Sequence, residues 1–341
     1  MQFKLNSISQ YRTPLMGIAT IMIIICHTLS YGEGVLMPDK ISKIVICGNF
    51  GVDIFLFLSG IGCYYSLNKG INLTKWYKKR IIRIFLPYTF IQIPFWIYRI
   101  LEGHFNLKEE LLCFSTISFW TKHIGAWYVA LLIPLYFLTP YIYKLVSEKC
   151  KYAFLNALIL IFLLLILCNL EINKTNETTY NILYNLQWAF CRVPSFIIGM
   201  YIAPFVKNNT TINVFKVIGF IIILLGIHVG VHRFIDKDIV LYWCLALPLV
   251  LGFTFFLSWL PQNGILLNSI SWMGVVSLES YLANIYLKDT IYQYIINAYP
   301  QKPNILYGHY LEYTCVIILG LILSYIIHKI VNKYEKVLFI K

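Results

Sequence analysis

The chain has 341 residues, of which 59% are hydrophobic and only 13% charged, whereas soluble domains carry about 25% charged residues. A net charge of +13 suggests nucleic-acid binding in a soluble protein, but in a membrane protein such an excess lies in cytoplasmic loops. The composition therefore excludes an ordinary soluble enzyme and argues against a nucleic-acid partner. It predicts one membrane-embedded domain over residues 1–341, with the lipid bilayer as its surroundings.

Apolar runs recur along the whole chain, and a membrane-spanning helix needs about 20 mostly apolar residues. We expect ten spans, at residues 14–31, 50–67, 84–101, 127–144, 152–170, 189–206, 217–234, 240–259, 270–287 and 310–328. An even number puts both termini on one side. With the N-terminus inside, the inner segments hold most of the Lys and Arg residues, as cytoplasmic loops do. The sequence thus predicts an all-α polytopic membrane protein with both termini cytoplasmic.

His27 is the first ionisable side chain inside a predicted span, and such residues are rare unless they have a function. From Pro14 to His27 a helix rises about 20 Å, which places His27 in the outer half of the membrane. Asp53, near the outer end of the second span, is expected at a similar depth. A carboxylate there would fix the imidazole tautomer and stabilise its protonated form. Two structural alternatives remain: a histidine bonded to a nearby carbonyl, and an aspartate at the positive end of its helix.

Arg80 and Arg83 lie on one helix face at the inner boundary, because residues three apart are neighbours on a helix. A guanidinium binds phosphate through paired hydrogen bonds, so the two residues are a candidate phosphate clamp. Ordinary anchoring by positive residues at the cytoplasmic boundary would explain them equally well.

Further polar residues fall within the later spans. Arg192 is early in the sixth span, and Glu279 and Asn284 are inside the ninth. A carboxylate in lipid is costly unless it is paired, and we consider Arg192 and His27 as partners of Glu279. His228, His232 and Asp236 have helical spacing that could bind a metal, but no fourth ligand is evident. We therefore expect no metal site.

These positions together predict a reaction. Arg80 and Arg83 would hold the phosphate-bearing end of a donor from the cytoplasm, and His27 would meet its reactive end about 20 Å away. The pantetheine arm of coenzyme A spans about that gap. Neutral His27 would take the proton of an acceptor hydroxyl as the hydroxyl attacks a thioester, with helix dipoles or Arg192 stabilising the oxyanion.

Six stretches resemble, in the same order, the bacterial membrane acyltransferase family 3, whose members include O-acetyltransferases of surface polysaccharides. The similarity covers roughly residues 12–330. The stretches are MGIATIMIIICHT with His27, FGVDIFLFLSG with Asp53 and Ser59, KKRIIRIFLPY with Arg80 and Arg83, AWYVALLIPLYFLTP with Trp127 and Tyr128, CRVPSFIIGM with Arg192, and MGVVSLESYL with Ser277, Glu279 and Tyr281.

The resemblance implies an enzyme of the bacterial cytoplasmic membrane that moves an acyl group, most simply acetyl, from acyl-CoA to a hydroxyl of a surface or lipid-linked polysaccharide. His27 would be the catalytic base, and Asp53 and Glu279 the other catalytic residues. The donor would contact Arg12, Arg80, Arg83, Trp127 and Tyr128. The carbohydrate acceptor would contact Arg192, Ser59, Ser277, Tyr281 and Asn284.

The sequence departs from the family pattern at two positions. The family commonly has an arginine at the position of Met16, while Arg12 lies one helical turn earlier, and it commonly has a histidine at the position of Asn284. Other functions stay open: an exporter of a polysaccharide or lipid-linked glycan, an O-succinyltransferase, or an acylase of a small molecule or lipid. Partners in polysaccharide synthesis, or a second copy of the chain, also stay open.

Overall fold

The computed structural model describes residues 2–29, 44–103, 105–172, 176–216, 242–298 and 305–339, and single positions between 218 and 226. Nearly all of these residues are helical, which confirms the all-α fold class. The helices are α1 (Ser7–Gln10), α2 (Arg12–Leu29), the 3-10 helix η1 (Cys47–Phe50), α4 (Gly51–Asn68), α5 (Leu73–Leu101), α6 (Leu107–Phe114), α7 (Ile117–Lys122), α8 (Trp127–Val146), α9 (Ala153–Asn169), α10 (Glu177–Phe190), α11 (Val193–Lys207), α13 (Tyr242–Trp259), α14 (Ile265–Val275), α15 (Ser277–Ala298) and α16 (Ile305–Phe339).

Five helical segments of the described chain are long and apolar enough to cross a membrane. A bent helix pair would make a sixth span, and three further apolar helices are shorter. Every expected span except 217–234 overlaps one of these segments, and 217–234 lies largely outside the described residues. The membrane class of the protein is therefore supported, whereas the count of ten spans and the cytoplasmic termini stay predictions. The five segments are Ile44–Asn68, Leu73–Leu101, Trp127–Val146, Glu177–Lys207 and Thr314–Leu338.

The expected span 270–287 is not one straight helix. It divides into α14 and α15, which are bent by 71° relative to each other at Val276. Close packing against α2 accompanies the bend: a Cβ on Gly274 would lie 1.9 Å from the Thr13 carbonyl oxygen, and one on Gly17 would lie 1.8 Å from that of Ile270. The bend puts Glu279 in the first turn of α15, where the positive end of the helix dipole favours a carboxylate.

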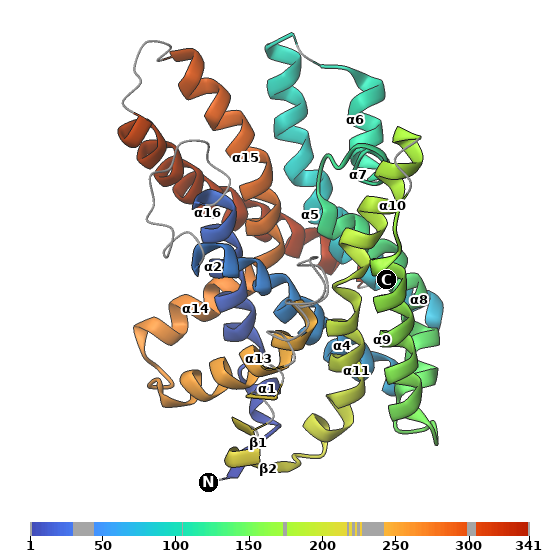
Figure 1. The fold of residues 1–341 in the computed structure, drawn as a ribbon. Helices are drawn as coiled ribbons and strands as arrows, with labels where there is room; N and C mark the ends of the chain where they lie inside the picture. Colours follow the sequence, from blue (N-terminus) through green and yellow to red (C-terminus); the bar gives the residue numbers. More distant parts are fainter. Residues whose placement is uncertain are drawn as a thin grey trace.

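Helix α4 lies in the centre of the bundle, and most of its residues are buried. Figure 1 shows α14 and α15 to one side of the central helices α2 and α4, and α8 to α11 to the other, while α16 starts beside α15 and runs across the bundle. The crossing of α4 and α11 depends on glycines, because a Cβ on Gly60 would lie 2.2 Å from the Phe196 carbonyl oxygen and one on Gly199 2.1 Å from that of Phe57. Small residues let membrane helices approach this closely.

Helix α9 presents large apolar side chains to the outside, among them Phe154, Leu158 and Phe162, with exposed fractions of 60%, 47% and 63%. A soluble protein rarely exposes such a continuous apolar surface, whereas hydrocarbon chains of a bilayer cover it at no cost. This helix therefore faces lipid.

A two-stranded antiparallel sheet joins the N-terminus to the segment after α11. Strand β1 (Gln2–Lys4) pairs with β2 (Thr211–Asn213), with Phe3 opposite Ile212. Because the strands are hydrogen-bonded, the start of the chain and the segment after α11 lie on the same side of the membrane.

Candidate active site

Two cavities share part of their walls, and three arginines line both. The basic cavity has a volume of about 650 Å³, and the central cavity of about 380 Å³. The shared side chains are Arg12 from α2 and Arg80 and Arg83 from α5. All three were predicted as donor contacts, and the structure brings Arg12 from α2 to the same walls as Arg80 and Arg83.

The wall of the basic cavity carries positive charge only. Its charged side chains are Arg12, Lys69, Lys75, Lys78, Lys79, Arg80 and Arg83, with no Asp or Glu among its lining residues. Most of these cations lie in the first turns of α5, where they oppose the helix dipole and do not help the helix form. An anion at this position would be stabilised both by the side chains and by the helix N-terminus.

Arg80 is held in place by groups on three sides. Its guanidinium donates to the Gly62 carbonyl oxygen at 3.3 Å and to Ser66 Oγ at 3.1 Å. It also lies over the rings of Trp76 and Tyr136, 5.4 Å and 5.6 Å from their centroids, a cation–π arrangement. Because protein groups already fix its position, Arg80 can meet a ligand without losing much conformational freedom.

Arg12 enters the site from one turn before the position where the family has its arginine. Its guanidinium lies beside Gly62, with Nη2 3.3 Å from where a Cβ of that residue would be, and it is close enough to interact electrostatically with Arg80 and Arg83. Its buried Nε has no hydrogen-bond partner among the described residues. Met16 lines the central cavity as well. Arg12 therefore reaches the region that an arginine at position 16 would also reach.

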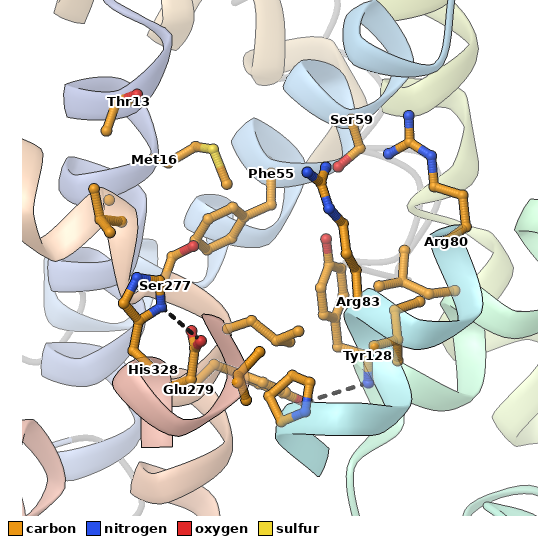
Figure 2. A pocket seen from close by; sticks show the side chains of 18 of the residues that line it. Thr13, Met16, Phe55, Ser59, Arg80, Arg83, Tyr128, Ser277, Glu279 and His328 are labelled. Carbon is orange, nitrogen blue, oxygen red and sulfur yellow. Dashed lines mark hydrogen bonds and ion pairs between the residues drawn. The ribbon is translucent and has the colours of Figure 1, made fainter. Parts of the chain in front are cut away.

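The central cavity gathers half of the other residues predicted from the sequence. Ser59, Tyr128, Ser277, Glu279 and Tyr281 all line it. Figure 2 shows Ser277 and Glu279 on one side of the cavity, and Ser59, Arg80, Arg83 and Tyr128 on the other. The two sides are joined where the Tyr281 hydroxyl accepts a hydrogen bond from the Tyr128 backbone N–H at 3.2 Å.

Glu279 has a partner that the sequence did not suggest. Its Oε1 is 2.9 Å from Nδ1 of His328 on α16, and the two side chains are only 7% and 21% exposed. His328 Nε2 lies 2.8 Å from Nδ2 of Asn332, and both residues line the central cavity. Neither Arg192 nor His27, the partners considered from the sequence, occupies this position. The signal was present in the sequence: His328, Asn332 and Glu335 have the i, i+4, i+7 spacing of one helix face.

His27 lies just beyond the central cavity. Ile23, one turn earlier on α2, and Tyr281 both line the cavity, and the rings of His27 and Tyr281 are 6.2 Å apart between centroids. Lys288 of α15 is close enough for its charge to act on His27. The structure thus brings the predicted base next to the end of the cavity farthest from Arg12.

Asp53 belongs to a different cluster. It forms a fully buried ion pair with Arg192, and it accepts a hydrogen bond from Ser195 Oγ at 2.9 Å. Arg192 also donates to the Asn49 carbonyl oxygen at 3.5 Å. The pair joins α4 to α11, and none of these residues lines either cavity. The catalytic role of Asp53 and the acceptor role of Arg192 stay predictions, with other partners than those first considered.

Two further predicted site residues, like His27, Asp53 and Arg192, lie outside the walls of both cavities. Trp127 is buried against Trp188, with centroids 4.5 Å apart, and Asn284 is buried on α15. The proposed metal-binding alternative at His228, His232 and Asp236 lies outside the described residues. Within the described part of the chain, no group of three or more His, Cys, Asp or Glu side chains could hold a metal ion.

The fold and these cavities define a helical membrane protein with a small central cavity and a basic entrance. The family model of the acyltransferase domain, family 3, matches residues 15–329, so the chain belongs to this family and is a membrane acyltransferase. No curated protein and no solved structure matches the chain.

Proposed function

We propose that the protein transfers an acyl group, most simply acetyl, from acyl-CoA bound on the basic side to a carbohydrate hydroxyl that reaches His27 from the other side. The observation that supports this best is the sharing of Arg12, Arg80 and Arg83 by the two cavities. A ligand with phosphates in the basic cavity has a direct way into the central cavity, which ends near His27.

The dimensions of the central cavity fit the arm of coenzyme A. Along α2 its wall runs from Arg12 to Ile23, which is about 16 Å at 1.5 Å per residue. Its apolar wall residues, such as Phe55, Ile84 and Leu132, suit a narrow, mostly aliphatic chain. With phosphates at the arginines, the thioester lies at the Tyr281 end.

The transfer itself needs one base and one oxyanion site. His27 takes the proton of the acceptor hydroxyl as its oxygen attacks the thioester carbonyl. The carbon–sulfur bond then breaks, and the thiolate leaves and receives the proton from the imidazolium. Positive charge on Lys288 stabilises the oxyanion that forms in between, as preorganised charge does in acyl transfer generally. Arg192, considered earlier for that task, is engaged by Asp53.

The carbohydrate acceptor, the bacterial cytoplasmic membrane and the acetyl group are proposed from the resemblance to polysaccharide O-acetyltransferases. The acceptor would come from a surface or lipid-linked polysaccharide. Three of its predicted contacts, Ser59, Ser277 and Tyr281, are at the wall of the central cavity. Of these, Tyr281 lies beside His27, where the two substrates would meet.

Replacement of His27 tests this function. The purified protein in lipid nanodiscs is given radiolabelled acetyl-CoA and surface polysaccharide from the source cell. His27→Ala should lower transfer by about 10²- to 10⁴-fold, the usual contribution of a general base. His123→Ala is the matched control, because His123 also lies among aromatic rings but outside both cavities.

Three results can follow. Loss of transfer in His27→Ala, with an unchanged melting temperature and an active control, supports the proposal. Undiminished acylation by His27→Ala rejects it. Glycan movement across the membrane without any acyl product from the unaltered protein favours the exporter instead.

A further inference from the structure

The polar face of α16 has no role in the transfer described so far. His328, Asn332 and Glu335 follow one another along this face and all line the central cavity. Glu335 lies at the arginine end, because its Oε1 is 3.8 Å from Arg83 Nε. His328 is about 10 Å farther along the helix, and it meets Glu279. An arm that runs from the arginines toward His27 therefore passes Asn332 and His328.

The hydrogen bonds of His328 and Asn332 determine which of their polar groups remain available to a ligand. A carboxylate only accepts hydrogen bonds, so the Glu279 contact places the imidazole proton on Nδ1 of His328. The Nε2 lone pair then accepts from the Asn332 amide. The Asn332 side chain retains a second amide proton and its carbonyl oxygen. The polar face of α16 thus offers one hydrogen-bond donor and one acceptor, both on Asn332. The bond from Asn332 to His328, and that from His328 to Glu279, hold them in place.

The pantetheine arm of acyl-CoA needs a hydrogen-bond donor and an acceptor of this kind. The pantetheine arm is aliphatic except for its amide groups and one hydroxyl, and each amide has one donor and one acceptor. Polar groups that leave water need such partners, since an unpaired buried amide costs about 1–3 kcal/mol. The neighbours of Asn332 in the cavity wall include the apolar residues Val331 and Leu278, so the free amide groups of Asn332 are placed to pair with an amide of the arm.

We propose that Asn332 binds the amide of the pantetheine arm farther from the sulfur, through its remaining N–H and its carbonyl oxygen. His328 and Glu279 are positioning residues, because Glu279 orients the imidazole and the imidazole holds the Asn332 side chain. This rests on the proposed acyl-CoA donor and names a specificity determinant for it. Asn332 selects thioesters that carry the full arm over shorter thioesters with the same acyl group.

Three donors of decreasing length test the proposal in nanodiscs: acetyl-CoA, acetyl-pantetheine, and S-acetyl-N-acetylcysteamine, which lacks the distal amide. Asn332→Ala and His328→Ala should raise KM about three- to tenfold for the two longer donors, the effect of one or two lost hydrogen bonds. They should leave KM for the shortest donor unchanged, and kcat should change little throughout. Glu279→Gln should follow the same pattern if Glu279 acts by orienting His328, whereas a fall in its kcat at unchanged KM would assign Glu279 the catalytic role expected from the resemblance and overturn its positioning role.

Ser324→Ala is the matched control, because Ser324 is on α16 one turn before His328 and bonds only to its own helix, at the Gly320 carbonyl oxygen. It should match the unaltered protein with every donor. Melting temperatures of all variants show whether α16 still packs.

The outcomes separate this proposal from the proposed function. Equal losses on all three donors, or a fall in kcat at unchanged KM, overturn the amide-binding role; the second result assigns His328 to acid–base chemistry. If the unaltered protein accepts no thioester at all, the acyl-CoA function itself fails. A KM increase confined to the two longer donors supports the amide-binding role.

Discussion

Arg12 offers the most direct test of how this chain binds its donor. The family commonly has an arginine at the position of Met16, one helical turn later, yet here Arg12 lines both cavities beside Arg80 and Arg83. We predict that Arg12→Ala weakens acyl-CoA binding, and that adding Met16→Arg to this variant restores it. Met16 lines the central cavity, so a guanidinium introduced there has access to the same space.

The size of the effect follows from the bond that is lost. A hydrogen bond to a charged group contributes about 1.5–3 kcal/mol, which corresponds to about a 10- to 150-fold rise in KM for acyl-CoA. Arg12→Lys keeps the charge but not the paired geometry of a guanidinium, so it should fall between Arg12→Ala and the unaltered protein. Because Arg12 is about 22 Å from His27 along α2, kcat should remain close to its original value.

The assay is steady-state acyl transfer in nanodiscs, with coenzyme A binding measured separately by isothermal titration calorimetry. Arg99→Ala is the control, since Arg99 is at the far end of α5, bonds to Glu110, and lines neither cavity. An unchanged KM and unchanged coenzyme A affinity in Arg12→Ala would refute the reasoning. A loss in Arg12→Ala that Met16→Arg does not reverse would show that the two positions do not serve one ligand group.

Three other predictions concern the surroundings of the site. Asp53→Ala should destabilise the protein by about 3–5 kcal/mol because it removes the carboxylate that neutralises the buried Arg192 charge. Replacing both residues by leucine should recover much of the melting temperature, whereas inactivation of Asp53→Ala at an unchanged melting temperature would indicate catalysis instead. Gly199→Leu should lower the melting temperature, since its Cβ would lie 2.1 Å from a backbone oxygen of α4 and overpacking costs about 1–3 kcal/mol. The control Gly252→Ala should leave the melting temperature unchanged, because there is open space around Gly252. Lys288→Met should lower kcat about 10²-fold if its charge stabilises the oxyanion, and Lys288→Arg should keep most of the activity; equal kcat values for the two variants would contradict that role.

The positions of the helices were largely predictable from the sequence, because a bilayer requires long apolar runs and these are visible residue by residue. The break at Val276 was not, because the polar residues that follow it, Ser277, Glu279 and Ser280, could equally lie within a straight span. The close approach of Gly274 to α2 that accompanies the break depends on two segments far apart in the chain. Prolines were equally ambiguous, for Pro87 and Pro94 both lie within the continuous helix α5.

For the site residues, the sequence predicts the depth in the membrane but not the partners that each side chain contacts. Depth can be counted along a helix, so the sequence placed His27 and Asp53 at a common level and Arg80 and Arg83 near the inner boundary. Depth does not say which helices touch. Asp53 pairs with Arg192, directly before α11, and Glu279 pairs with His328 of α16. Which charged residues pair is decided by which helices are in contact, and two residues at the same depth need not be neighbours.

The volume of the central cavity bears on the choice between an enzyme and an exporter. About 380 Å³ is near the lower end of the range of small-molecule sites, which suits a narrow arm but not a chain of sugar rings passing through. The basic entrance also favours a phosphate-bearing donor over a neutral glycan. In the proposed function, the acceptor carbohydrate approaches the Tyr281 end of the cavity from the side of His27, while the donor arm fills the cavity from the side of Arg12. Two substrates that arrive from opposite directions can both be bound at once, which favours direct transfer within a ternary complex over a mechanism in which one product leaves before the second substrate binds.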